Sequence, residues 1–128
     1  MHLFEQHSGK PTGMERTARL ALTLAARRVP RYDSRFSRRD FTRPQLLACV
    51  LLRSAYGLTF RGVCELLEAS PALREALGLS RTPHFTTVES CANAPGMEEL
   101  VQHLLTELML HIGGGAKPAV RDAARMVR

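Results

Sequence analysis

The 128-residue sequence contains no tryptophan, and aromatic residues make up only 5% of it. A core must therefore be built from leucine, alanine and valine. Three cysteines at scattered positions cannot form a disulfide framework or a CxxC zinc motif, which favours a reducing compartment. No segment approaches the roughly 18 consecutive apolar residues of a membrane span, and the first residues lack a signal-peptide pattern. We therefore expect a soluble protein of the cytoplasm that makes no contact with a membrane.

Basic residues outnumber acidic ones by 18 to 12, and the excess lies near the two ends of the chain. Residues 1–43 hold ten Lys or Arg against four acids, residues 44–112 hold four against seven, and residues 113–128 hold four against one. The run Arg27–Arg31 is able to neutralise phosphates, which favours nucleic acid as a partner. A solvated linker whose charge serves solubility is an equally simple interpretation.

Apolar residues recur at helical spacing, and no stretch shows a convincing β alternation. A first helix is expected over 14–28, where alanines and leucines form an apolar band that ends before Pro30. The strongest start signal is Thr42–Gln45, because a capping threonine, an early proline and a Gln at the third helical position coincide there. Gly57 is expected to close this second helix.

Further capping signals divide the rest of the chain into short helices. Thr59 opens one, Ser70 opens a shorter one that ends at Gly78, and Thr86 begins a capping-box pattern for a helix through about Ala94. A last amphipathic helix spans 97–112, with Ile112 among its inward residues. The side chains expected in the core are Leu46, Leu47, Val50, Leu51, Val63, Leu66, Leu67, Leu73, Leu77, Val88, Leu104 and Leu108.

The predicted fold class is all-α. We expect a small multi-helix bundle with a helix-turn-helix-like arrangement and flexible basic N- and C-terminal ends. Residues 1–40 are assigned to a basic N-terminal arm with one helix, and residues 41–112 to a helical domain.

Three motifs in the helical domain carry a resemblance. They are Tyr56–Arg61 (Tyr-Gly-Leu-Thr-Phe-Arg), Leu77–Leu79 (Leu-Gly-Leu) and Pro83–Val88 (Pro-His-Phe-Thr-Thr-Val). In this order and spacing they resemble the N-terminal helical region of bacterial insertion-sequence transposases of the DDE class. The resemblance covers roughly residues 41–112 and implies that the helical domain binds DNA, at the ends of an insertion sequence.

Complete members of that family continue into an RNase-H-like domain, whose first strand ends in a catalytic aspartate. Asp122 stands about where the resemblance expects this carboxylate, but Arg121 interrupts the apolar strand pattern and no Thr-Gly follows. The second Asp and the Glu of the family are absent. The resemblance thus implies a truncated transposase fragment, in which residues 113–128 are disordered or the start of a missing catalytic domain. We expect no enzymatic activity.

No metal, cofactor or catalytic residue is predicted. Glutamates on the expected helices are interpreted as solvated faces, and Cys49, Cys64 and Cys91 as buried small hydrophobic residues. His103 and His111 show no ligand spacing and are interpreted as surface residues. The glycines that follow Ile112 lack the Lys-Ser/Thr of a P-loop.

DNA is the predicted partner. If residues 70–77 are the first helix of a helix-turn-helix pair, residues 86–94 are its recognition helix. The polar side chains of that helix can contact phosphates or base edges. Thr86 has the alternative role of capping that helix, and arginines receive more weight as phosphate contacts. The predicted DNA-binding residues are Arg27, Arg28, Arg31, Arg53, Arg61, Arg74, Arg81, His84, Thr86, Thr87, Ser90 and Asn93.

Two functions of other classes remain open. One is a helical protein-interaction module that forms a homodimer through the face of the helix over 97–112, which would expose leucine and methionine without a catalytic domain to cover it. The other is a free-standing helix-turn-helix regulator.

Overall fold

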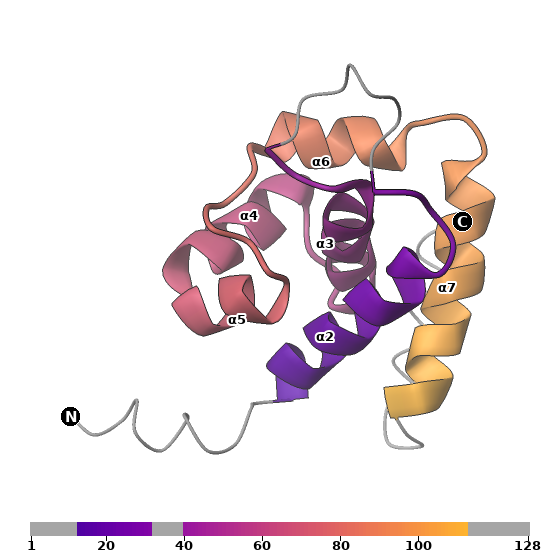
Figure 1. Ribbon diagram of the computed structural model, residues 1–128, viewed down its shortest axis with the longest axis horizontal. Helices are drawn as coiled ribbons and strands as arrows, with labels where there is room; N and C mark the ends of the chain where they lie inside the picture. Colours follow the sequence, from indigo (N-terminus) through magenta and orange to yellow (C-terminus); the bar gives the residue numbers. More distant parts are fainter. Residues whose placement is uncertain (1–12, 32–39, 113–128) are drawn as a thin grey trace.

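The computed structural model describes residues 13–31 and 40–112, and these residues form α-helices and no β-strand (Figure 1). The helices are α2 (Gly13–Ala26), α3 (Arg43–Ala55), α4 (Phe60–Ala69), α5 (Pro71–Ala76), α6 (Phe85–Ala92) and α7 (Met97–Ile112). The all-α prediction is confirmed. The ends expected to be flexible, 1–12 and 113–128, lie outside the described residues.

Helix α3 occupies the centre of the bundle and packs against α2, α4, α6 and α7 (Figure 1). All residues from Leu47 to Leu52 are buried, which is more than one full turn of the helix. A helix that is covered on all sides needs apolar residues all round, and this run supplies them. Among the described helices, none is by itself long and apolar enough to cross a membrane.

Helix α2 belongs to the same core. Its inward face consists mainly of alanines and Leu24, which is only 2% exposed, and it packs against α3, α5 and α7. Small alanine side chains allow α2 to lie close to α3. The segment expected to be an N-terminal arm thus contains a helix whose packing makes it part of the bundle.

Three of the predicted start signals, at Thr42, Thr59 and Ser70, are confirmed by the cap geometry. The hydroxyl of Thr42 accepts the backbone N–H of Gln45 at 3.2 Å, and Gln45 Oε1 accepts the backbone N–H of Thr42 at 2.9 Å. This reciprocal pair is a complete capping box. Thr59 and Ser70 cap α4 and α5 through their hydroxyl groups in the same way. Each cap satisfies a backbone donor that the helix leaves without an internal partner.

A sharp corner joins α3 to α4. The two helix axes turn through 107° across residues 56–59, and Gly57 adopts a φ of 65°, a conformation that favours glycine. Two helices at this angle with a short glycine-containing turn form a helix-turn-helix-like corner. The pair expected to form it, α5 and α6, do not contact each other: α5 packs on α2 and α4, whereas α6 packs on α3, α4 and α7.

Burial agrees with the predicted core except at Leu46 and Leu66, which are half-buried at its edge. Leu46 is less covered because it lines an open groove beside α4. Ile112, expected to point inward, is 39% exposed because it is the last residue of α7.

Candidate nucleic-acid interface

Arginines occupy the outer side of α2 and the turn that follows it. The exposed members are Arg16, Arg19, Arg27, Arg28 and Arg31. They are left to solvent because the alanine-rich side of α2 is turned toward the core. The backbone carbonyl of Arg31 accepts the N–H of Arg43 at 2.7 Å, which fixes this segment to the start of α3.

The first four of these arginines have no carboxylate partner among the described residues. Within the described part of the chain, Arg16, Arg19, Arg27 and Arg28 form no ion pair. Glu15 is the one carboxylate of α2, and it is half-buried. The outer side of α2 and the turn that follows it therefore form a positively charged ridge, a name that we use for these four residues.

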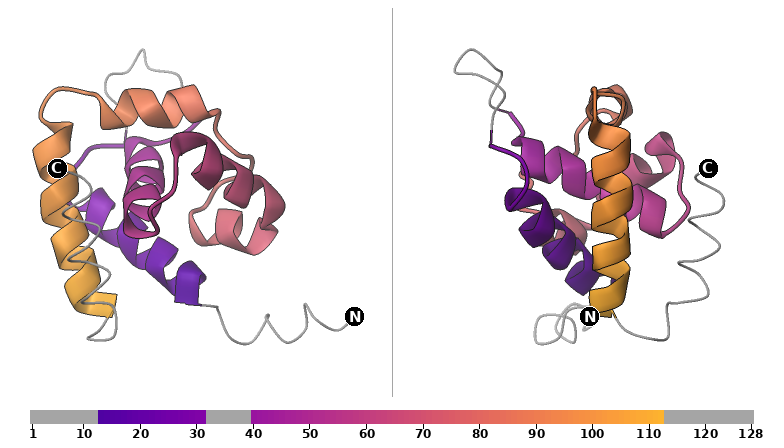
Figure 2. Two further views of the ribbon diagram at one scale, coloured as in Figure 1. Left: turned by 180° about the vertical axis from the view of Figure 1, so that it is seen from behind. Right: turned by 90° about the vertical axis from the view of Figure 1, so that its right-hand side faces the viewer.

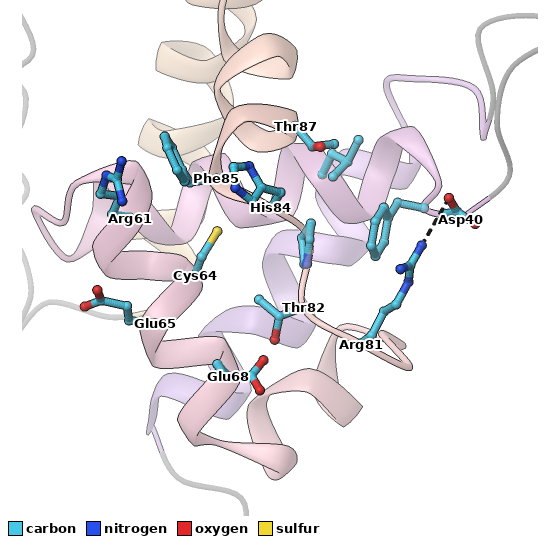
Figure 3. A pocket seen from close by; sticks show the side chains of 13 residues that line it. Asp40, Arg61, Cys64, Glu65, Glu68, Arg81, Thr82, His84, Phe85 and Thr87 are labelled. Carbon is cyan, nitrogen blue, oxygen red and sulfur yellow. Dashed lines mark ion pairs between the residues drawn. The ribbon is translucent and has the colours of Figure 1, made fainter.

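A second set of charged residues lines a groove of about 680 Å³ beside α4 (Figure 3). Its other wall is the connector that leads into α6, together with the start of that helix. The apolar part of the lining consists of Phe41, Leu46, Cys64, Pro83 and Phe85. We call this cavity the α4 groove.

Both arginines of the α4 groove already have partners. Arg81 Nη2 lies 3.1 Å from Asp40 Oδ2, in the ion pair drawn in Figure 3. The Arg61 guanidinium stacks 4.0 Å above the centre of the Phe85 ring, a cation–π contact.

Acidic side chains outnumber arginines in the same groove. Glu65 and Glu68 line it from α4 in addition to Asp40. Three carboxylates against two guanidinium groups repel a phosphate backbone. The α4 groove is therefore a poor place for DNA, although two of the predicted contacts, Arg61 and Arg81, lie there.

Helix α6 begins earlier than expected, because its N-cap is His84 and not Thr86. His84 Nδ1 accepts the backbone N–H of Thr86 at 3.3 Å, and the Thr86 hydroxyl lies 2.8 Å from the same nitrogen. Thr86 thus sits inside the first turn, and its predicted capping role is wrong. Capping preferences favour Ser, Thr, Asp and Asn, so the sequence gives no signal for an imidazole acceptor in this position.

The polar residues of α6 divide between two environments. Thr86, Ser90 and Asn93 are exposed, and their spacing of four and three places them on one face. Thr87 is half-buried and lines the α4 groove. Helices α2 and α6 do not contact each other and lie on different sides of α3 (Figures 1 and 2). The predicted DNA-binding residues thus fall on separate surfaces.

Two predicted contacts, Arg74 and Arg53, are half-buried and engaged within the fold. Arg74 Nη1 donates to the carbonyls of Leu67 at 2.6 Å and of Glu68 at 2.8 Å, near the end of α4. The Arg53 guanidinium lies 4.3 Å above the ring of Phe60. The hydrogen bonds of Arg74 stabilise the end of α4, and the contact of Arg53 with Phe60 stabilises the packing of α4 on α3. A role of either residue in DNA binding stays a prediction.

Arg16 and Arg19 are missing from the predicted DNA-binding residues. Their three-residue spacing, on the side of α2 opposite Ala18 and Ala21, is the signal that identifies them as neighbours on an outer helix face.

The burial of the cysteines agrees better with a role in packing than with a catalytic role. Cys49 and Cys64 are buried and Cys91 is half-buried. Burial raises the pKa of the Cys49 thiol, with a further contribution from Cys64 and Cys91, and burial also raises the pKa of the Cys64 thiol. A thiol that holds its proton is a poor nucleophile and a poor metal ligand.

Among the described residues, no group of three or more His, Cys, Asp or Glu is arranged to hold a metal ion. His103 and His111 are exposed, as expected. Asp122 and the glycines after Ile112 lie outside the described residues.

No protein-family model, curated protein or solved structure matches this chain. The transposase origin therefore stays a prediction that rests on the motifs within residues 41–112.

Proposed function

We propose that the helical domain binds the phosphate backbone of DNA through the positive ridge of α2. The observation that supports this most directly is the exposure of four arginines that form no ion pair within the described residues. Guanidinium groups that are free of carboxylates can neutralise phosphates and release counterions, and this release supplies most of the free energy of non-specific DNA binding. Binding of this kind positions a protein on DNA and carries no sequence information.

We further propose that this binding belongs to a transposase-like, catalytically inactive protein of the cytoplasm. The support is the order of the motifs at Tyr56–Arg61, Leu77–Leu79 and Pro83–Val88. In this proposal the exposed face of α6, with Thr86, Ser90 and Asn93, offers a second contact that reads base edges. Because α6 and α2 lie on different sides of α3, one straight duplex does not reach both surfaces equally, and the ridge is the primary contact.

Titration of a labelled duplex at several salt concentrations tests the proposal. For four to six phosphate contacts, the logarithm of the affinity should fall against the logarithm of the salt concentration with a slope of roughly −4 to −5. An affinity that does not change with salt would overturn the proposal and assign the basic residues to solubility.

A pair of matched variants locates the contact. The double variant Arg27→Gln/Arg28→Gln removes two charges from the ridge and should reduce the magnitude of the salt slope by about two. The control Arg61→Gln/Arg81→Gln removes two charges from the α4 groove, where carboxylates already balance them, and should change the slope by much less. Equal changes in the two variants would contradict the assignment to α2.

An interaction module that dimerises through α7 has less support. The leucines and methionines expected on its open face are mostly buried against α2 and α3, and Leu110, 70% exposed, is the largest exception. Single exposed apolar residues are common on protein surfaces. Sedimentation of the intact chain separates the two functions, because a stable homodimer without DNA affinity would favour the module.

A further inference from the structure

We infer that a groove between α2 and the end of α7 binds a phosphate group. The groove has a volume of about 480 Å³ and lies where the outer side of α2 meets the last turn of α7. Its lining includes Arg16, Arg19, Leu20, His111 and Ile112. The inference rests on the proposed function, since the phosphate in question is that of a DNA strand, and it names the place where one such phosphate is held.

The charges that line this groove are of one sign. Arg16 and Arg19 are exposed, stand three residues apart on one side of α2 and form no ion pair within the described residues. Of the described residues that line the groove, none is acidic. The α4 groove has three carboxylates in a larger cavity, so the smaller groove is the better site for an anion.

His111 adds a third polar side chain from the opposite wall. Its Nδ1 lies 2.9 Å from the backbone carbonyl of Glu107. A carbonyl oxygen only accepts, so Nδ1 carries the hydrogen of this bond and Nε2 is left for a ligand. When the ring is protonated, Nε2 also becomes a donor. The hydroxyl of Thr23 donates to the carbonyl of Arg19 at 3.0 Å and offers its proton to the helix instead of a ligand.

The apolar walls strengthen the attraction between the groove and a charged ligand, but neither they nor the helix ends determine whether that ligand is an anion or a cation. Leu20 and Ile112 provide apolar walls, which reduce the screening of a charge held between them. The positive N-terminal end of α2 and the negative C-terminal end of α7 meet at the groove, and their dipoles offset each other. The two arginines therefore determine that the groove attracts an anion.

The first experiment uses inorganic phosphate as the probe and the intact chain as the receptor. Phosphate titrated into isotopically labelled protein should shift the side-chain NMR signals of Arg16, Arg19 and His111. The variant Arg16→Gln/Arg19→Gln should lose the shift at His111. The control variant Arg27→Gln/Arg28→Gln, on the same side of the bundle but outside the groove, should keep all three. Shifts that remain in the groove variant would overturn the site.

The second experiment compares two histidine variants of α7 in their affinity for a labelled duplex. The charged or titratable groups on α2 are Glu15, Arg16 and Arg19, and those on α7 are Glu98, Glu99, His103, Glu107 and His111. Of these, Arg16, Arg19 and His111 line the groove. His111→Gln removes the imidazole from the groove and should weaken binding by about three- to tenfold, whereas His103→Gln, at an exposed histidine of the same helix outside the groove, should leave the affinity unchanged. Equal effects of the two variants would contradict the role of His111.

Failure of this inference and failure of the proposed function give different results. Salt-sensitive DNA binding that responds to Arg27→Gln/Arg28→Gln, with no effect of Arg16→Gln/Arg19→Gln or His111→Gln, would refute the groove and confine the contact of the ridge with DNA to Arg27 and Arg28. Phosphate shifts at His111 without any affinity for duplex DNA would support the groove as a site for free phosphate and refute DNA as its source.

Discussion

The ridge of α2 and the α4 groove both carry arginines, but the surroundings of each guanidinium group differ. On the ridge, Arg27 and its neighbours are exposed and form no ion pair within the described residues. In the groove, Arg81 is paired with Asp40 and Arg61 is stacked on Phe85. The same type of side chain is thus exposed without an ion pair among the described residues on one surface, and engaged by neighbouring side chains on another.

The same contrast explains why the net charge of the chain alone does not predict whether its surface attracts an anion. The chain carries a net charge of +6, yet its described residues hold ten arginines and nine carboxylates. The described bundle is therefore close to neutral, and its attraction for an anion depends on how the charges are distributed. The fold separates them by turning the alanine face of α2 inward, which leaves its arginines outside and away from the glutamates of α4.

The largest expected effect concerns the anchoring of the ridge. Leu24→Ala removes a side chain that is 2% exposed in the core and should lower the free energy of unfolding by about 2 to 5 kcal/mol. The control Thr23→Ala alters an exposed residue of the same helix and should stay within about 0.5 kcal/mol. Urea denaturation measures both. Equal, small effects would mean that α2 is an arm and that the ridge has no fixed position.

A smaller effect is expected at the start of α3. Besides its part in the capping box, Gln45 Nε2 donates to the carbonyls of Leu77 at 3.2 Å and Gly78 at 2.8 Å. Gln45→Ala should therefore cost about 1 to 2 kcal/mol of unfolding free energy. Thr59→Ala removes a local cap of α4 with no such long-range bond and should cost about 1 kcal/mol. An equal cost in both would show that the bonds to the residues after α5 contribute nothing.

The sequence predicts the parts of this fold that depend on local signals. Thr42, Thr59 and Ser70 are identified as helix starts because a cap and the backbone N–H that it accepts lie within three residues of each other. His84 is missed because its imidazole takes a role that is usually held by hydroxyl or carboxylate side chains. The pairing of α3 with α4 is likewise not foreseen, since the corner at Gly57 is evident only from the angle between the helices.

The candidate site is less predictable because its parts are distant in sequence. Arg16 and His111 meet only after α2 and α7 pack together, and no local pattern links residues so far apart. Whether an arginine is engaged is also a tertiary property. Arg74 caps the end of α4, and nothing in its sequence neighbourhood distinguishes it from the exposed Arg27.

An effect of similar size concerns Cys49, a buried thiol of α3. Burial raises the pKa of Cys49, so above pH 8.5, about the ordinary value of a thiol, the unfolded chain releases a proton that the folded protein keeps. Stability should then fall as the pH rises from 8.5 to 10, by at most about 1.4 kcal/mol per pH unit for this one group. Denaturation midpoints of the native chain and Cys49→Ala at pH 7.5 and 10 test this. The variant should lose less stability over this interval, and parallel losses would exclude the thiol as the cause.

In the last prediction we expect no activity: the protein should not cleave DNA in a strand-cleavage assay with Mg²⁺ or Mn²⁺. In-line phosphoryl transfer needs cations held by several converging carboxylates, and the described residues contain no arrangement of three or more His, Cys, Asp or Glu suited to a metal. The carboxylate in the register of the transposase family is Asp122, whose sequence neighbours Arg121 and Arg125 oppose a cation. We therefore expect the native chain and Asp122→Ala to leave terminal-repeat DNA equally intact. Metal-dependent cleavage by the native chain that is lost in the variant would shift the function from the ridge of α2 to the residues beyond α7, and would indicate that a partner chain supplies the remaining carboxylates.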